Sequence, residues 1–216
     1  MKTFSFVLGV VLLLIPTFSF AEKARVIEWN DLIPKQLRAD DQLSHLTEEE
    51  LDRVEWVIYL RRNLPEKITE RDQVFYDEMI ESIGEWRKKG IDVDKIVAER
   101  QVRENSLNSE LDGKRIRLAG YLLPLNLSNK VIKEFLLVPY IGACTHVPPP
   151  PRNQIIYATT GKAITFVASE IFEPVWATGR LIMKPMSKEL YLGDGTGNIN
   201  IGYALAVDKI EPYKEQ

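Results

Sequence analysis

The sequence predicts an α+β protein in which a helical section comes first and a small, partly closed β-barrel comes second. Apolar residues recur at helical spacing between residues 47 and 110, whereas polar and apolar residues alternate from about residue 111 onward. Charge changes at the same point. Residues 40–110 carry 19 acidic and 11 basic side chains, and residues 111–216 carry 9 acidic and 12 basic. A change in charge that coincides with a change in periodicity predicts two structural sections.

Residues 1–21 have the pattern of a cleavable secretory signal. Lys2 supplies the positive charge, residues 4–15 form an apolar run, and Ser19-Phe20-Ala21 resembles a cleavage site. The run is shorter than the roughly 20 apolar residues that a transmembrane helix needs. We therefore expect an exported mature chain without a membrane anchor, an uncleaved N-terminal anchor being the alternative. Residues 22–46 are expected to form an ordered arm.

The acidic helical section is predicted to span residues 47–110. Thr47 and Glu50 form a capping box, which predicts a helix over residues 48–62. A second helix is expected after a cap at Thr69 and before Gly90, and a third over residues 93–103. The second helix is expected to bury one apolar face, made of Val74, Phe75, Met79, Ile83 and Trp86. The acidic outer face is interpreted as an ordinary solvated surface, with docking of a basic partner as the alternative.

The barrel section is predicted to span residues 111–216. Its five expected strands cover residues 114–125, 134–140, 154–159, 175–183 and 202–210. Gly120 and Gly179 would permit the sharp bends that a small barrel needs. The glycine-rich stretch 193–198 lacks the lysine of a phosphate-binding loop, so it predicts a hairpin turn.

The most unusual segment is residues 139–154, where the only cysteine, Cys144, stands two residues before His146. In an extended backbone these two side chains point to the same face, so they are candidate ligands for zinc or another transition metal. The prolines at 148–151 favour a stiff polyproline II segment. Two alternatives stay open, which are a thiol nucleophile with a histidine base, and a buried cysteine beside a structural histidine.

Candidate ligand-binding residues lie around this segment. Arg152, Asn153 and Gln154 follow the prolines as polar groups on the same loop. Tyr121 is a further candidate, because with Tyr140, Tyr157 and Trp176 it could form an aromatic platform or instead belong to the core. His45, the other histidine, is expected to be a surface residue.

Three motifs resemble the DUF3299 family of exported bacterial proteins. They are Gly-Tyr-Leu-Leu-Pro-Leu at 120–125, Phe-Leu-Leu-Val-Pro-Tyr at 135–140, and Gly-Ala-Cys-Thr-His-Val followed by four prolines at 142–151. The similarity is expected over roughly residues 108–212, with the acidic helices outside it. The resemblance implies an OB-like barrel, a periplasmic location, and association with ABC-type transport and zinc-responsive genes. It implies no enzymatic reaction.

These observations predict a periplasmic, non-enzymatic binding or accessory protein of an ABC-type transport or zinc-homeostasis system, with a membrane permease as the expected partner. A small thiol-dependent enzyme and a structural adaptor for a membrane partner are the alternatives. Export, together with 27 basic against 31 acidic residues once Lys2 is removed, argues against nucleic-acid binding.

Overall fold

The computed structural model describes most of the chain after the expected signal segment. The described residues are 22–38, 42–125, 131–143, 149–161, 164, 166–167, 171–192 and 195–213. The predicted signal peptide and the predicted metal ligands Cys144 and His146 therefore lie outside the described residues. Within the described ranges, no helix is long and apolar enough to cross a membrane.

Three helices form a section with its own hydrophobic core. They are α1 (Glu48–Asn63), α2 (Gln73–Lys88) and α3 (Val93–Asn105). The predicted capping box is present, since the Glu50 amide donates to Thr47 Oγ1 and the Thr47 amide donates to Glu50 Oε2. Buried side chains from all three helices form this core, chiefly Val54, Val57, Ile58, Met79, Ile83, Trp86, Val93 and Ile96.

The start of α2 differs from the prediction. The Thr69 hydroxyl donates to Asp72 Oδ2 at 2.6 Å within a turn, and the helix begins only at Gln73. Val74 and Phe75 are 70% and 44% exposed, so the predicted apolar face is buried only farther along α2, at Met79, Ile83 and Trp86. The predicted end is confirmed, since Gly90 has φ 84°.

The Glu50 carboxylate links α1 to the end of α2, and this link should make stability depend on pH. Lys89 Nζ lies 2.9 Å from Glu50 Oε1, and this bond lowers the pKa of Glu50 to about 2. Because the pKa of this carboxyl is lower in the folded chain than in the unfolded chain, the ionised carboxylate stabilises the fold at pH values above the unfolded pKa of about 4.5. This stabilisation is lost as the pH falls towards 2. In urea unfolding at pH 6, 4 and 3, Glu50→Gln should therefore lose less stability on acidification than wild type. Glu49→Gln is the control and should keep the wild-type slope.

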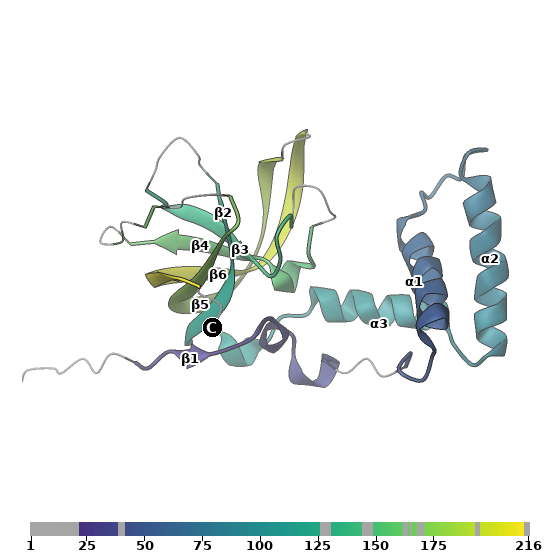
Figure 1. The fold of residues 1–216 in the computed structure, drawn as a ribbon, viewed down its shortest axis with the longest axis horizontal. Coiled ribbons are helices and arrows are strands. Elements are labelled where there is room, and N and C mark those ends of the chain that lie inside the picture. The colour runs from purple at the N-terminus through teal and green to yellow at the C-terminus, as the bar shows by residue number, and fades with distance from the viewer. Residues whose placement is uncertain are drawn as a thin grey trace, which may run out of the picture.

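Six strands form one mixed sheet (Figure 1). Their order is β1 (Arg25–Val26), β2 (Arg115–Pro124), β3 (Glu134–Val138), β4 (Ile156–Thr160), β6 (Gly195–Pro212) and β5 (Glu173–Leu192). Strand β5, at one end of this order, also pairs with β2, so β2, β3, β4, β6 and β5 form a closed ring of pairings, with β1 added beside β2. The α+β class and the five predicted strands are confirmed, and β1 from the arm is an additional strand.

Strands β5 and β6 are longer than predicted because they continue as a hairpin beyond the ring. Leu192 pairs with Gly195, and pairing runs back from there to the ring. Gly179 sits at a register shift, where a Cβ atom would lie 2.2 Å from the Ala206 oxygen. A glycine at this point lets the two strands approach more closely than any other residue would allow.

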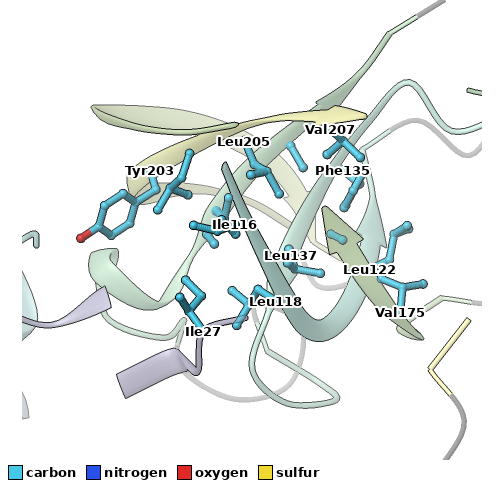
Figure 2. Close-up of a cluster of buried hydrophobic side chains, with 14 of the residues drawn as sticks. Ile27, Ile116, Leu118, Leu122, Phe135, Leu137, Val175, Tyr203, Leu205 and Val207 are labelled. Carbon is cyan, nitrogen blue, oxygen red and sulfur yellow. The ribbon is translucent and has the colours of Figure 1, made fainter. Parts of the chain in front are cut away.

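The core inside the ring is apolar and includes the N-terminal arm (Figure 2). Ile116, Leu118 and Leu122 of β2 and Phe135 and Leu137 of the neighbouring β3 belong to this core. Two residues of the arm, Ile27 and Leu32, are buried in the same cluster. Burying a side chain of this size contributes about 1.5–3 kcal/mol, so the arm is an integral part of the sheet section.

A second apolar layer covers the opposite face of β3. Leu136 and Val138 are fully buried there with Ile199 and Ile201 from the hairpin extension. Strand β3 therefore has no face in contact with solvent, which explains the apolar run from residue 135 to residue 138.

Candidate binding groove

A groove of about 640 Å³ lies between the helical section and the sheet section. In Figure 1, α3 runs between the sheet and the α1–α2 pair, so the two sections meet along this helix. The groove is lined by residues of α1, α3 and two loop segments, namely Tyr59, Arg62, Asn63, Glu104, Tyr140, Ile141, Pro149, Pro150 and Pro151. Its volume is within the range of about 300–1,000 Å³ that ligand sites occupy.

The walls of the groove expose aromatic and apolar side chains. On α1, Tyr59 lines the groove and is 50% exposed, and Trp56, which is 43% exposed, stacks on Tyr59 beside the groove with ring centroids 5.5 Å apart. On the opposite wall, Tyr140 and Ile141 are 43% and 66% exposed. Isolated exposed apolar residues are common, but several around one concavity indicate an interaction site.

The charged residues of the groove neutralise each other. Arg62 donates to both carboxylate oxygens of Glu104, at 3.0 and 2.6 Å. An exposed pair of this kind adds little stability, on the order of 0–1 kcal/mol. Its structural effect is to hold α1 against the end of α3, and the groove surface that remains is largely apolar.

Asn153 fixes the proline wall to the helical section. Its side chain is nearly fully buried, and Nδ2 donates to the carbonyls of Arg103 and Ser106 at 2.7 and 2.9 Å. These carbonyls lie at the C-terminal end of α3, where helical amides no longer follow, and the Arg103 carbonyl also accepts from the Ser106 amide at 3.3 Å. Gln154 Nε2 donates to the Trp29 carbonyl at 3.1 Å and so links the same loop to the arm.

The predicted ligand-binding residues beside the prolines are thus used within the protein. The Asn153 and Gln154 amides bind backbone carbonyls, and Arg152 Nε is buried without a hydrogen-bond partner in the described part of the chain. None of the three lines the groove. Their assignment as ligand-binding residues stays a prediction.

A buried hydroxyl joins the arm, the segment after α3 and the sheet. Tyr203 Oη accepts from the Asn108 amide at 2.6 Å and donates to the Leu32 carbonyl at 2.7 Å. Burial raises the pKa of Tyr203 to about 12, so the hydroxyl stays protonated and keeps donating at neutral pH. The Tyr203 hydroxyl and the Asn153 amide therefore hold the arm, the end of α3 and the sheet together beside the groove.

Tyr121 lies in a different, smaller pocket of about 260 Å³. It lines this pocket together with Trp29, Ala119, Gly120, Pro139, Pro174 and Tyr213. The four aromatic residues of the predicted platform have different surroundings, although Tyr121 and Tyr157 both pack against the buried cluster that contains Leu136 and Val138. Tyr140 lines the groove, Tyr157 lies beneath Lys188 Nζ at 3.8 Å, and Trp176 lies beneath the Arg117 guanidinium at 4.4 Å.

The predicted metal site cannot be located from the described residues, because both ligands fall outside them. Among the residues that the structure does describe, no group of three or more His, Cys, Asp or Glu side chains could hold a metal ion. His45 is exposed, which confirms its prediction as a surface residue.

Sequence reasoning missed the α1 side of the groove. Trp56 and Tyr59 lie off the buried face formed by Val54, Val57 and Ile58, and large aromatic residues on the polar side of a helix are the signal that could have found them. The sequence analysis did single out the opposite wall, through Cys144, His146, the prolines and Tyr140.

Comparison with known proteins identifies a family but no activity. The model of the DUF3299 family, a protein family of unknown function, matches residues 29–212. The match includes the helical section, so the expectation that these helices lie outside the family similarity is wrong. A crystal structure of a DUF3299 family protein from Pseudomonas aeruginosa PAO1 is 22% identical, with a TM-score of 0.48, over 90% of this chain and 99% of that chain. No curated protein matches the sequence.

Proposed function

The chain belongs to the DUF3299 family, and we propose that it is an exported, non-enzymatic binding protein of the cell envelope. It acts in the periplasm as an accessory component of an ABC-type transport or metal-homeostasis system and contacts a membrane partner. The groove between α1 and the proline wall carries this proposal, since it is the place where exposed aromatic side chains surround a ligand-sized concavity.

The sheet section is proposed to be an OB-like barrel. Support comes from the closed ring of five strands, in which β2 pairs with β3 and β5, and from the close approach at Gly179. OB barrels bind oligonucleotides and oligosaccharides on the face of their second and third strands. Here those strands are β3 and β4, and the outer face of β3 is covered by Ile199 and Ile201. Covering this face favours the groove as the binding site.

The lining of the groove favours binding over catalysis. Its charged side chains, Arg62 and Glu104, are paired with each other, and its other described polar side chains are the Tyr59 and Tyr140 hydroxyls and the Asn63 amide. Covalent catalysis needs a nucleophile activated by a base within hydrogen-bond reach. The described lining offers no such pair, and its apolar area suits a protein segment.

Site-specific photocrosslinking in cells tests this function. p-Benzoylphenylalanine at Ile141, which is 66% exposed in the groove, should crosslink to an integral membrane protein of the envelope, identified by mass spectrometry. The same probe at Val74, which is 70% exposed on α2, should not form that adduct. The adduct from Ile141 should also be lost in Tyr59→Ala. Equal adducts from both positions, or none from Ile141, would overturn the proposal.

Metal handling is a version of this function with its own measurement. Ile141 and Pro149 line the groove and stand three residues from Cys144 and His146 respectively. Three residues span at most about 11 Å, so a metal held by these side chains would lie near the groove. The mature protein should then retain or take up zinc, measured by elemental analysis after dialysis, and the double variant with Cys144→Ser and His146→Ala should take up none. Arg152→Ala is the control that keeps both ligands. Unchanged stoichiometry in the double variant would remove the metal version.

A further inference from the structure

The groove also carries information about the chemistry of its partner. Resting on the function proposed above, we propose that it selects an extended peptide segment in which a cationic side chain precedes or follows a short apolar stretch. The occupant is a segment of a partner protein. The negative charge near one end of the groove favours a segment that carries a cation over segments that do not.

The α1 wall of the groove continues as a stripe along the helix. Asp52, Trp56, Tyr59 and Asn63 are spaced by four, three and four residues, which places them on one helix face. At 1.5 Å per residue the stripe is about 16 Å long, the length of roughly five extended peptide residues. Tyr59 and Asn63 line the groove itself, while Trp56 stacks on Tyr59 and extends the apolar surface towards Asp52.

One end of this stripe is acidic. Glu48, Glu49 and Asp52 are exposed and make no ion pair within the described part of the chain. Their neighbours differ, since Glu50 pairs with Lys89 and Glu55 pairs with Arg100. The positive end of the α1 dipole, equivalent to about half a charge, offsets only a small part of three carboxylates. The N-terminal end of the stripe therefore attracts a cation.

The aromatic pair provides a second contact for the same cation. Exposed Trp and Tyr rings attract Lys or Arg side chains through the negative face of the ring. Elsewhere in this protein such contacts already occur, with Arg117 over Trp176 and Lys188 over Tyr157. Beyond the aromatic pair the lining is uncharged apart from the neutralised Arg62 and Glu104 pair. A peptide with a cationic side chain at one end and apolar side chains along the rest therefore matches this surface.

Three fluorescein-labelled peptides test this selectivity by fluorescence anisotropy with the mature full chain. Their sequences are Lys-Lys-Gly-Leu-Leu-Phe-Gly, Glu-Glu-Gly-Leu-Leu-Phe-Gly and Lys-Lys-Gly-Ser-Ser-Ser-Gly. The first should bind at least about tenfold more tightly than each of the other two, which lack the charge or the apolar contribution. Equal binding of all three, or of the first and second, would overturn the proposal, and so would no binding at all.

Variants locate the binding and separate charge from fold. Asp52→Lys should weaken binding of the basic apolar peptide by about two- to fivefold and strengthen binding of the acidic apolar peptide. Glu81→Lys, which changes an exposed charge on α2, should leave the affinity for both peptides unchanged. Tyr59→Ala should weaken the basic apolar peptide by about tenfold, and Phe75→Ala, which removes a comparably exposed aromatic residue of α2, should not. Circular dichroism establishes that each variant is folded. A reversed response to Asp52→Lys, or equal losses in Tyr59→Ala and Phe75→Ala, would contradict the site.

The outcomes distinguish this inference from the function on which it rests. A membrane-protein adduct from Ile141 with no preference among the peptides would keep the function and reject the selectivity. Selective peptide binding without such an adduct would reject the function. A second copy of the chain as occupant would appear as concentration-dependent dimerisation in light scattering, lost in Tyr59→Ala, and would also overturn the peptide proposal.

Discussion

Replacing Gly179 with alanine is expected to destabilise the sheet section by about 3 kcal/mol, since an added methyl group has no room at the register shift between β5 and β6. Its Cβ would lie 2.2 Å from the Ala206 oxygen and 2.8 Å from the Ala206 carbonyl carbon and the Val207 Cα. All three are backbone atoms, so no side chain can rotate to relieve the overlap. The strands would have to separate at the point where the ring bends. Urea unfolding at neutral pH measures the effect as a lower midpoint.

Gly84→Ala is the matched control for this prediction. Gly84 lies within α2, and a Cβ atom there would meet nothing within 4 Å. The same change should therefore stabilise the protein by roughly 0.5–1 kcal/mol, because alanine is the better helix former. If Gly179→Ala left the urea midpoint unchanged, β5 and β6 could not be as close as the structure has them.

Asn153→Ala is expected to cost about 1–3 kcal/mol of folding free energy, because this nearly fully buried side chain donates to two backbone carbonyls. The change removes the hydrogen bonds from the Asn153 amide to the Arg103 and Ser106 carbonyls, of which the Arg103 carbonyl still accepts from the Ser106 amide. Leaving one buried acceptor unsatisfied costs about 1–3 kcal/mol. Because the two carbonyls end α3, the loss should loosen the attachment of the helical section to the sheet section. The free energy of unfolding from urea titration measures it.

Two further variants separate the lost hydrogen bonds from other effects. Asn153→Asp keeps the shape of the side chain but donates no hydrogen bond when ionised, so its loss should be at least as large. Asn105→Ala removes an exposed amide that donates to the Gln101 carbonyl on the same helix, and it should cost no more than about 0.5 kcal/mol. If Asn153→Asp were as stable as wild type, the role of the two carbonyl bonds would be refuted.

Most of the fold could be predicted from the sequence because local signals were strong. The capping box at Thr47, the glycine at residue 90 and the alternation from residue 115 each mark a boundary or a period that the structure confirms. The start of α2 could not be predicted so well, because Thr69 and Asp72 form a turn that competes with a cap for the same hydrogen bonds. The lengths of β5 and β6 depend on pairing between distant residues, which local patterns do not contain.

The candidate site was predicted only on its loop side. The proline segment was conspicuous in the sequence, but the groove also needs Tyr59, on which Trp56 stacks, and these residues lie about 90 residues earlier. Their approach depends on how α3 is fixed by Asn153, a contact between segments that no spacing rule predicts. Asn153 was chosen as a candidate ligand-binding residue because a polar residue beside a proline run gives no sign that it is buried. In the structure it is buried and bonds the Arg103 carbonyl.

The double covering of β3 has a consequence for how the molecule opens. Amide protons exchange with solvent water only when their hydrogen bonds break, and a strand enclosed on both sides cannot open by fraying at a surface. The amides of Phe135–Val138 should therefore be among the last to take up deuterium, at a rate that reports complete unfolding of the sheet section.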